Sequence, residues 1–297
     1  MTIKEKLKRN KILYTFVRKI KYIWRYFMSV LCETMWFYMR YMFRKLHILK
    51  TDHFIESLKD KYKGKRIFVV ATGPSLTIDT LNRLMEAGEI CISCNGIFKL
   101  FDKTKWRPDY YVMDDYWLIK KYISDFPDVK IDTIGRKGTV LAEKCKGFIP
   151  YSENMQHTGY IPVCYFDHWY THYSRFFHYN RKITLGVFDF YTVTNFAINI
   201  ADYMGASEVY LLGVDCDYTS TSIHAGESDA ILTEEQKKNN IEMEKGMLNG
   251  YEKLNCLIGN KIKIFNLNPS GKVDVFPRMT LEEALSEKVN LLAIPEK

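Results

Sequence analysis

Polar side chains follow four short apolar runs, at the points where strands are expected to end. Thr72-Gly73-Pro74-Ser75 follows residues 66–71, Asn95 follows 90–93, Asp114 and Asp115 follow 110–113, and Asp215 follows 208–212. The carboxyl ends of parallel strands meet at one edge of a sheet, where open α/β proteins bind their ligands. Hydroxyl, amide and carboxylate groups at such an edge can bind the phosphate, sugar and base of a nucleotide. The sequence therefore predicts a nucleotide site.

The first of these segments has the residue types of a phosphate-binding turn. Gly73 permits close approach of the backbone, and Ser75 is expected to cap the helix that follows, whose first N–H groups face the ligand. An ordinary strand-to-helix turn with a serine cap is the alternative. Asp114 and Asp115 are either a metal-binding pair or the N-cap of a helix. The chain has neither a Walker A loop nor a G-x-G-x-x-G sequence, which disfavours P-loop ATPases and NAD enzymes.

Strand and helix patterns alternate from residue 65 onward, which predicts a mainly parallel sheet covered by helices. We expect residues 51–297 to form a Rossmann-like three-layer α/β/α sandwich, similar to a GT-A variant. The expected strands are 66–71, 90–93, 110–113, 130–134, 161–166, 208–212 and 261–265. The expected helices are 76–88, 117–126, 190–204, 234–257 and one beginning at 281.

Residues 1–50 differ from the rest of the chain in charge and pattern. They hold 13 Lys and Arg against Glu5 and Glu33, a net +11, whereas the remainder has 30 basic and 33 acidic residues. Apolar residues recur every three or four positions over 13–31, and 35–43 is rich in aromatics and methionine. This pattern predicts a basic, aromatic, amphipathic helical arm lying on an anionic membrane surface. A hairpin packed on the body, or on a second copy in a homo-oligomer, is the alternative.

The charge distribution and the absence of several signals narrow the function classes. The body is slightly acidic, so it is not expected to bind nucleic acid. The longest uncharged run in the arm, 26–32, is far shorter than the ~20 residues that span a bilayer. Lys and Arg interrupt the first 25 residues, so no secretory signal is expected. We expect a cytoplasmic protein, peripheral at the inner face of the cell membrane.

The order of these motifs resembles that of a known enzyme superfamily. Gly73-Pro74-Ser75-Leu76 after a strand, Cys94-Asn95 after the next, Ile183–Gly186, and Leu212–Asp215 resemble the bacterial sialyltransferases of glycosyltransferase family 42. They also resemble the related motility-accessory-factor and pterin pyrophosphokinase-like domains. The resemblance covers about residues 65–285 and leaves the arm unmatched.

The resemblance implies a set of donor-binding residues. Asp114 stands where the family has Asn, which adds negative charge near a phosphate and raises the prospect of a metal or another donor. Thr72 also replaces an Asn of the family. The implied donor-binding residues are Thr72, Gly73, Pro74, Ser75, Asn95, Asp114, Thr184, Gly186, Gly213, Asp215, Asn268 and Ser270.

The resemblance also implies an activity and two catalytic residues. His224 would be the general base and Tyr218 would hydrogen-bond the leaving phosphate. The expected reaction is inverting transfer of a sialic-acid-like sugar from a CMP-activated donor to a cell-surface glycan precursor or lipid-linked acceptor. No cofactor is expected, and no metal unless the donor is a diphosphate, in which case Asp114 and Asp115 would bind it. The alternatives are a pyrophosphokinase-like transfer from ATP with Mg²⁺, or a non-catalytic membrane-associated nucleotide or glycan binder.

Overall fold

Seven parallel strands form a single sheet in the computed structural model of the chain, in the order β5-β4-β3-β2-β1-β6-β7. The structure describes residues 11–46, 52–113, 131–137, 155–162, 183–184, 187, 192–219, 224–225, 231–259 and 261–292. The strands are β1 Arg66–Val70, β2 Cys91–Cys94, β3 Tyr110–Met113, β4 Ile131–Lys137, β5 Met155–Pro162, β6 Glu208–Leu212 and β7 Lys263–Asn266.

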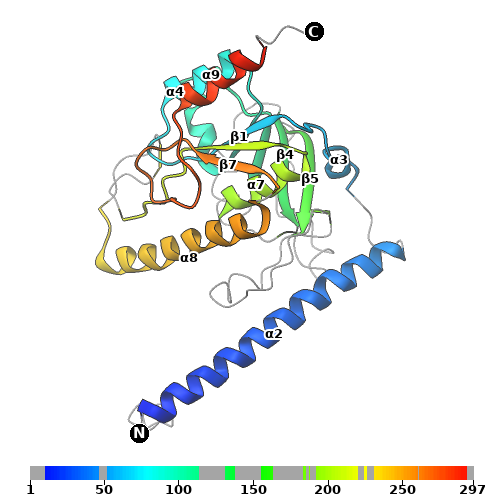
Figure 1. The fold of residues 1–297 in the computed structure, drawn as a ribbon, viewed down its shortest axis with the longest axis vertical. Helices are drawn as coiled ribbons and strands as arrows, with labels where there is room; N and C mark the ends of the chain where they lie inside the picture. The colour runs from blue at the N-terminus through cyan, green and yellow to red at the C-terminus, as the bar shows by residue number, and fades with distance from the viewer. Residues whose placement is uncertain are drawn as a thin grey trace.

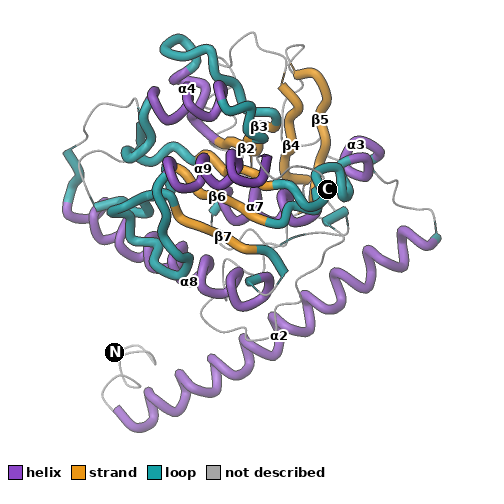
Figure 2. The backbone as a smooth tube through the Cα atoms, turned by 45° about the horizontal axis from the view of Figure 1, so that its top comes forward, coloured by secondary structure: helices purple, strands orange, loops and turns teal. Residues whose placement is uncertain are grey.

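Helices cover both faces of this sheet (Figures 1 and 2). One buried core joins the sheet to α3, α7 and α8, and a second core joins the opposite face to α4, η1 and α9. The three-layer α/β/α prediction is therefore confirmed. The helices are α2 Lys11–Lys45, α3 His53–Ser57, α4 Ile78–Glu86, the 3₁₀ helix η1 Asn95–Leu100, α7 Val193–Tyr203, α8 Glu234–Ile258 and α9 Leu281–Leu292.

The central strands form because their short apolar runs are buried on both faces. Every residue of β2 and β3 is buried, as are four of the five in β1. Successive β1 side chains point to opposite faces, so Ile67 and Val69 enter one core while Phe68 and Val70 enter the other. Parallel strands covered on both faces are expected to be continuously apolar in this way.

Two sequence predictions need correction. The strand expected at 161–166 is β5, at Met155–Pro162, so only its last two residues were anticipated. Ser75 does not cap the helix after β1: α4 begins at Ile78, and the side chain of its N-cap Thr77 accepts from the Thr80 N–H. The helix expected at 117–126 lies outside the described residues.

The predicted arm contains one continuous helix. α2 runs from Lys11 to Lys45, joining the two stretches that the sequence pattern separated, and Figure 1 shows it beside the sheet domain, outside both helical layers. No helix among the described residues has the length and apolar character needed to cross a membrane. The predicted domain boundary at 50/51 falls among residues 47–51, which are not described.

Candidate functional site

The order of the strands marks one place on the sheet where a ligand can bind. From the central β1 the chain first builds β2 to β5 on one side, and then β6 and β7 on the other. Val70 at the end of β1 pairs with Ser93 of β2 and with Leu212 of β6. The loops that follow these strands therefore leave the sheet on the same side, beyond the carboxyl ends of the strands. Between β1 and β6 the connections diverge, and ligands of open α/β sheets bind at such a switch point.

The loops after β1 and β6 are hydrogen-bonded to each other beyond the ends of the strands. Ala71 N donates to Leu212 O and Gly73 N to Gly213 O, both at 2.8 Å. Further along, Asp215 Oδ2 accepts from Ser75 Oγ at 2.8 Å and from Ser75 N at 3.3 Å. The motifs Thr72–Ser75 and Gly213–Asp215 therefore form one interlocked unit, although they lie far apart in the sequence.

The two glycines of this unit are required by the contact between the loops. A Cβ on Gly213 would lie 2.6 Å from Ala71 O. Gly213 also has a φ of +64°, a backbone conformation that residues with a side chain rarely adopt. A Cβ on Gly73 would lie 1.9 Å from Asp215 Oδ2 and 2.5 Å from Gly213 O. Gly73 was expected to admit a phosphate closely, but here its missing side chain makes room for the β6 loop.

Asp215 therefore has a structural contact in addition to any contact with a ligand. Its Oδ2 accepts from the N–H and the hydroxyl of Ser75, a residue that the resemblance assigned to donor binding. Its Oδ1 forms no hydrogen bond with any described residue, so this oxygen can accept from a ligand hydroxyl.

His224 lies against the same turn. Its Nδ1 is 3.3 Å from Thr72 Oγ1, and the neighbouring Ala225 N donates to Thr72 O at 2.7 Å. The rings of His224 and Tyr218 meet edge to face with centroids 6.4 Å apart. The structure thus brings together the β1 turn, the β6 loop and both residues that the sequence identified as catalytic candidates.

Tyr218 is held in place by its backbone and is partly buried against the core. Its N–H donates to Glu244 Oε2 at 3.2 Å and its carbonyl accepts from Asn240 Nδ2 at 2.8 Å, both from α8. Burial raises the pKa of the Tyr218 phenol above its usual range. The phenol therefore keeps its proton at neutral pH and can donate a hydrogen bond to an anion.

A lysine that the sequence did not single out joins three segments at this site. Lys272 Nζ donates to Asp217 Oδ1 at 2.8 Å and to Glu244 Oε2 at 2.9 Å, and Lys272 N donates to Asp215 O at 2.8 Å. The hydrogen bond from Lys272 holds the pKa of Asp217 below its ordinary value. Lys272 and Glu244 carried no sequence signal, because one lies in an ordinary turn and the other in a charged helix.

The turn after β7 contributes a buried amide. Asn268 is 2% exposed; its Oδ1 accepts from Ser270 N at 3.0 Å and its N–H donates to Asn266 Oδ1 at 3.1 Å. Its Nδ2 has no acceptor within the described part of the chain. A buried amide with an unmet donor is costly, so it is a candidate for contact with a ligand.

Of the remaining predicted site residues, the structure describes some and not others. Asn95 follows β2 with φ +49°, a left-handed conformation that Asn tolerates, and its carbonyl accepts from the Tyr111 hydroxyl. Thr184 is half-buried. Asp114, Asp115 and Gly186 lie outside the described residues. Among the residues that are described, no three His, Cys, Asp or Glu side chains gather in a group that could hold a metal ion.

Comparisons with known proteins identify a family. The family described as "6-hydroxymethylpterin diphosphokinase MptE-like" matches residues 41–221, more than half of the chain but not His224 or the β7 turn. No curated protein matches. A solved structure, the MAf glycosyltransferase from Magnetospirillum magneticum AMB-1, is similar over 79% of this chain at 16% identity and a TM-score of 0.45. That likeness covers 38% of the MAf chain, so this chain spans about two fifths of its length.

Proposed function

We propose that this chain, which belongs to the 6-hydroxymethylpterin diphosphokinase MptE-like family, transfers a sialic-acid-like sugar from a CMP-activated donor to a cell-surface glycan precursor or lipid-linked acceptor. The observation that carries the proposal is the position of His224, with Nδ1 3.3 Å from Thr72 Oγ1 at the end of β1. The His224 imidazole and the partly buried Tyr218 phenol therefore lie beside the turn at the sheet's switch point, where a base and a hydrogen-bond donor would serve the proposed reaction.

The donor is proposed to lie across the interlocked loops, with its phosphate beside Thr72 and its ribose beside Asp215. Asp215 Oδ1 would accept from a ribose hydroxyl, because Oδ2 is already bound to Ser75. Asn268 Nδ2 would donate to the base and so gain the acceptor it lacks among the described residues. A CMP-sugar presents a single phosphate, so its charge can be met by the Thr72 hydroxyl and the Tyr218 phenol.

The proposed reaction is a single displacement with inversion. The acceptor hydroxyl oxygen forms a bond to the anomeric carbon while the bond from that carbon to the CMP phosphate oxygen breaks. His224 takes the acceptor proton, which requires its imidazole to be neutral before the reaction. The electron pair of the broken bond stays on the phosphate, and the protonated Tyr218 phenol stabilises it by a hydrogen bond.

The family's description favours a second candidate, diphosphate transfer from ATP to a pterin-like alcohol. In that reaction the acceptor oxygen attacks the β-phosphorus of ATP and AMP leaves. Asp114 and Asp115 would be the ligands of the required Mg²⁺. His224 could act as a base in either reaction, so the two proposals differ in the donor and in their dependence on a metal.

Product release distinguishes the two reactions directly. The full chain is incubated with CMP-sialic acid and a sugar acceptor, and separately with ATP, Mg²⁺ and 6-hydroxymethylpterin. We expect CMP release that persists in EDTA and no formation of AMP. AMP formation that EDTA abolishes and Mg²⁺ restores would replace the glycosyl-transfer proposal. Binding of nucleotides without turnover in either mixture would support a non-catalytic binder.

A further inference from the structure

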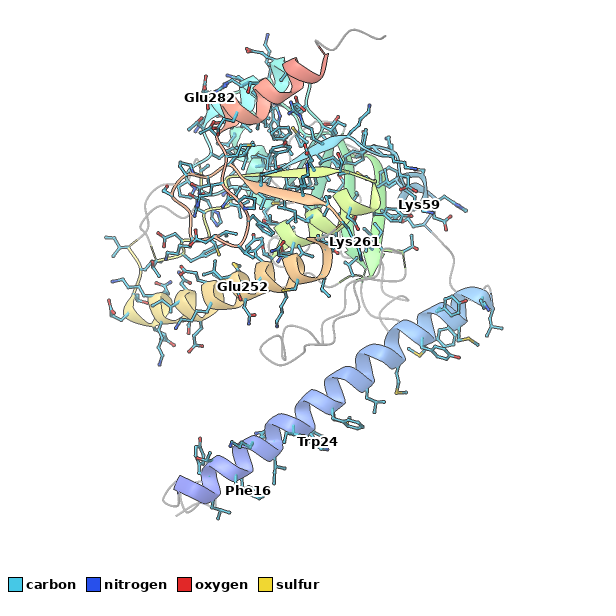
Figure 3. All side chains as sticks on the ribbon, in the orientation of Figure 1. Phe16, Trp24, Lys59, Glu252, Lys261 and Glu282 are labelled. Carbon is cyan, nitrogen blue, oxygen red and sulfur yellow. The ribbon has the colours of Figure 1, made fainter. Side chains whose placement is uncertain are left out.

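One side of α2 carries exposed, mainly apolar side chains along most of its length. Phe16, Ile20, Ile23, Trp24 and Phe27 are each more than half exposed, between 51% and 63%. Figure 3 shows Phe16 and Trp24 on the open surface of the helix, with no element of the body against them. We call this surface the arm face. It consists of Leu13, Phe16, Val17, Ile20, Ile23, Trp24, Phe27, Leu31, Met35, Tyr38, Tyr41 and Met42.

The arm face runs straight along the helix axis. An α-helix returns to the same angle after about five turns, or about 18 residues. Phe16 and Phe27 are followed at that interval by Thr34 and Lys45. The other five arm-face residues between Leu13 and Phe27 are followed by an apolar or aromatic residue, so the face does not wind around the helix. These exposed pairs are Leu13 with Leu31, Val17 with Met35, Ile20 with Tyr38, Ile23 with Tyr41, and Trp24 with Met42.

Basic side chains border the arm face on both sides. Lys19 and Lys21 adjoin Ile20 in the sequence, so each lies about 100° from the centre of the face, on opposite flanks. Both are exposed. Lysine can lay its apolar stem beside an apolar surface while its ammonium group stays in water. Thr15, about 140° from Ile20, lies on the polar side and is also exposed.

We propose that α2 lies flat in the headgroup layer of an anionic membrane, with the arm face inserted among the acyl chains. Residues 1–50 carry 13 basic and two acidic residues, which complements an anionic surface. Trp24, Tyr38 and Tyr41 are the residue types that favour the boundary between water and lipid. A face that runs straight along the helix fits a flat membrane surface. A face that packs on a partner helix in a coiled coil follows an apolar repeat of about 3.5 residues per turn instead of 3.6.

Cosedimentation of the full chain with lipid vesicles tests this proposal. Wild type should bind vesicles containing phosphatidylglycerol, bind pure phosphatidylcholine vesicles much more weakly, and lose affinity as salt rises. Two variants add the same charge on different sides of α2: Ile20→Glu on the arm face and Thr15→Glu on the polar side. Both lose the same electrostatic attraction, so their difference reports insertion. Ile20→Glu should bind at least about tenfold more weakly than Thr15→Glu.

Three results would overturn the proposal. Equal losses in the two variants would show that the arm face does not touch lipid. Equal binding of wild type to both kinds of vesicle would remove the role of charge. Failure of wild type to bind, together with a dimer in sedimentation velocity that Ile20→Glu dissociates, would assign the face to a second copy. Unchanged unfolding temperatures confirm that neither variant perturbs the body, which leaves the comparison valid.

Discussion

Replacing Gly213 with alanine tests whether the loops after β1 and β6 pack as closely as the site requires. The new Cβ would lie 2.6 Å from Ala71 O and 3.2 Å from Leu76 Cβ, so it meets a backbone atom that cannot move alone. Gly88 provides a matched control, because its φ of +60° is close to the +64° of Gly213 while no atom lies within 4 Å of its Cβ position.

The control separates the two costs of the substitution. Alanine in a left-handed conformation costs roughly 1–2 kcal/mol, and Gly88→Ala should show this cost alone. Gly213→Ala adds a steric overlap between the new Cβ and Ala71 O. To relieve it, the loops after β1 and β6 must move apart, which strains the hydrogen bond from Gly73 N to Gly213 O. Overpacking of this kind typically costs about 1–3 kcal/mol more. At about 2–4 °C per kcal/mol for a domain of this size, Gly213→Ala should melt several degrees below Gly88→Ala.

Thermal unfolding followed by circular dichroism measures both variants, and titration with CMP measures the site. Gly213→Ala should also weaken CMP binding, because the interlocked unit carries the proposed ribose contact, whereas Gly88→Ala should bind as wild type does. Equal melting temperatures for the two variants would refute the close packing of the loops. Unchanged CMP affinity in a destabilised Gly213→Ala variant would instead show that the packing of the two loops is not needed for CMP binding.

Further expectations concern single side chains. His224→Ala should lower turnover by about 100-fold or more with little change in CMP affinity, and unchanged turnover would make His224 a surface residue. Asp215→Asn retains an oxygen that can accept from Ser75, so it should melt within about 2 °C of wild type, whereas Asp215→Ala should melt lower still. The lowered pKa of Asp217 contributes stability that is present above its ordinary value of 3.8 and is lost as pH falls through the lowered pKa. Lys272→Met should therefore flatten the acid limb of the stability curve in urea unfolding from pH 2 to 6; an unchanged limb would contradict that coupling.

The local pattern of apolar residues in the sequence was sufficient to predict the central strands of the sheet. β3 and β6 have the predicted bounds, because each is a short apolar run between turns and is buried on both faces. β5 was misplaced because its sequence, MQHTGYIP, places Gln, His, Thr and Gly in succession and so lacks a continuous apolar run. As the outermost strand of the sheet it also needs less burial than a central strand. Its strand conformation depends on pairing with β4, a long-range contact that a local pattern does not encode.

The sequence predicted that the turn after β1 and the loop after β6 lie together, but it did not predict the contacts between them. Ser75 and Thr77 are both good capping residues, and the local sequence does not choose between them. Asp215, which is distant in the chain, binds Ser75 and leaves Thr77 as the cap of α4. Lys272 and Glu244 were missed for a related reason, because their roles depend on the folded loop that brings them together.

The placement of a bound nucleotide tests the central claim most directly. Crystals of the full chain are soaked with CMP and, in parallel, with ATP and Mg²⁺, and the electron density of each is located. The proposed function predicts CMP over the loops after β1 and β6, with its phosphate beside Thr72 and its ribose near Asp215 Oδ1. Density for CMP elsewhere on the chain, or for ATP but not CMP at this edge, would contradict a CMP-dependent transferase.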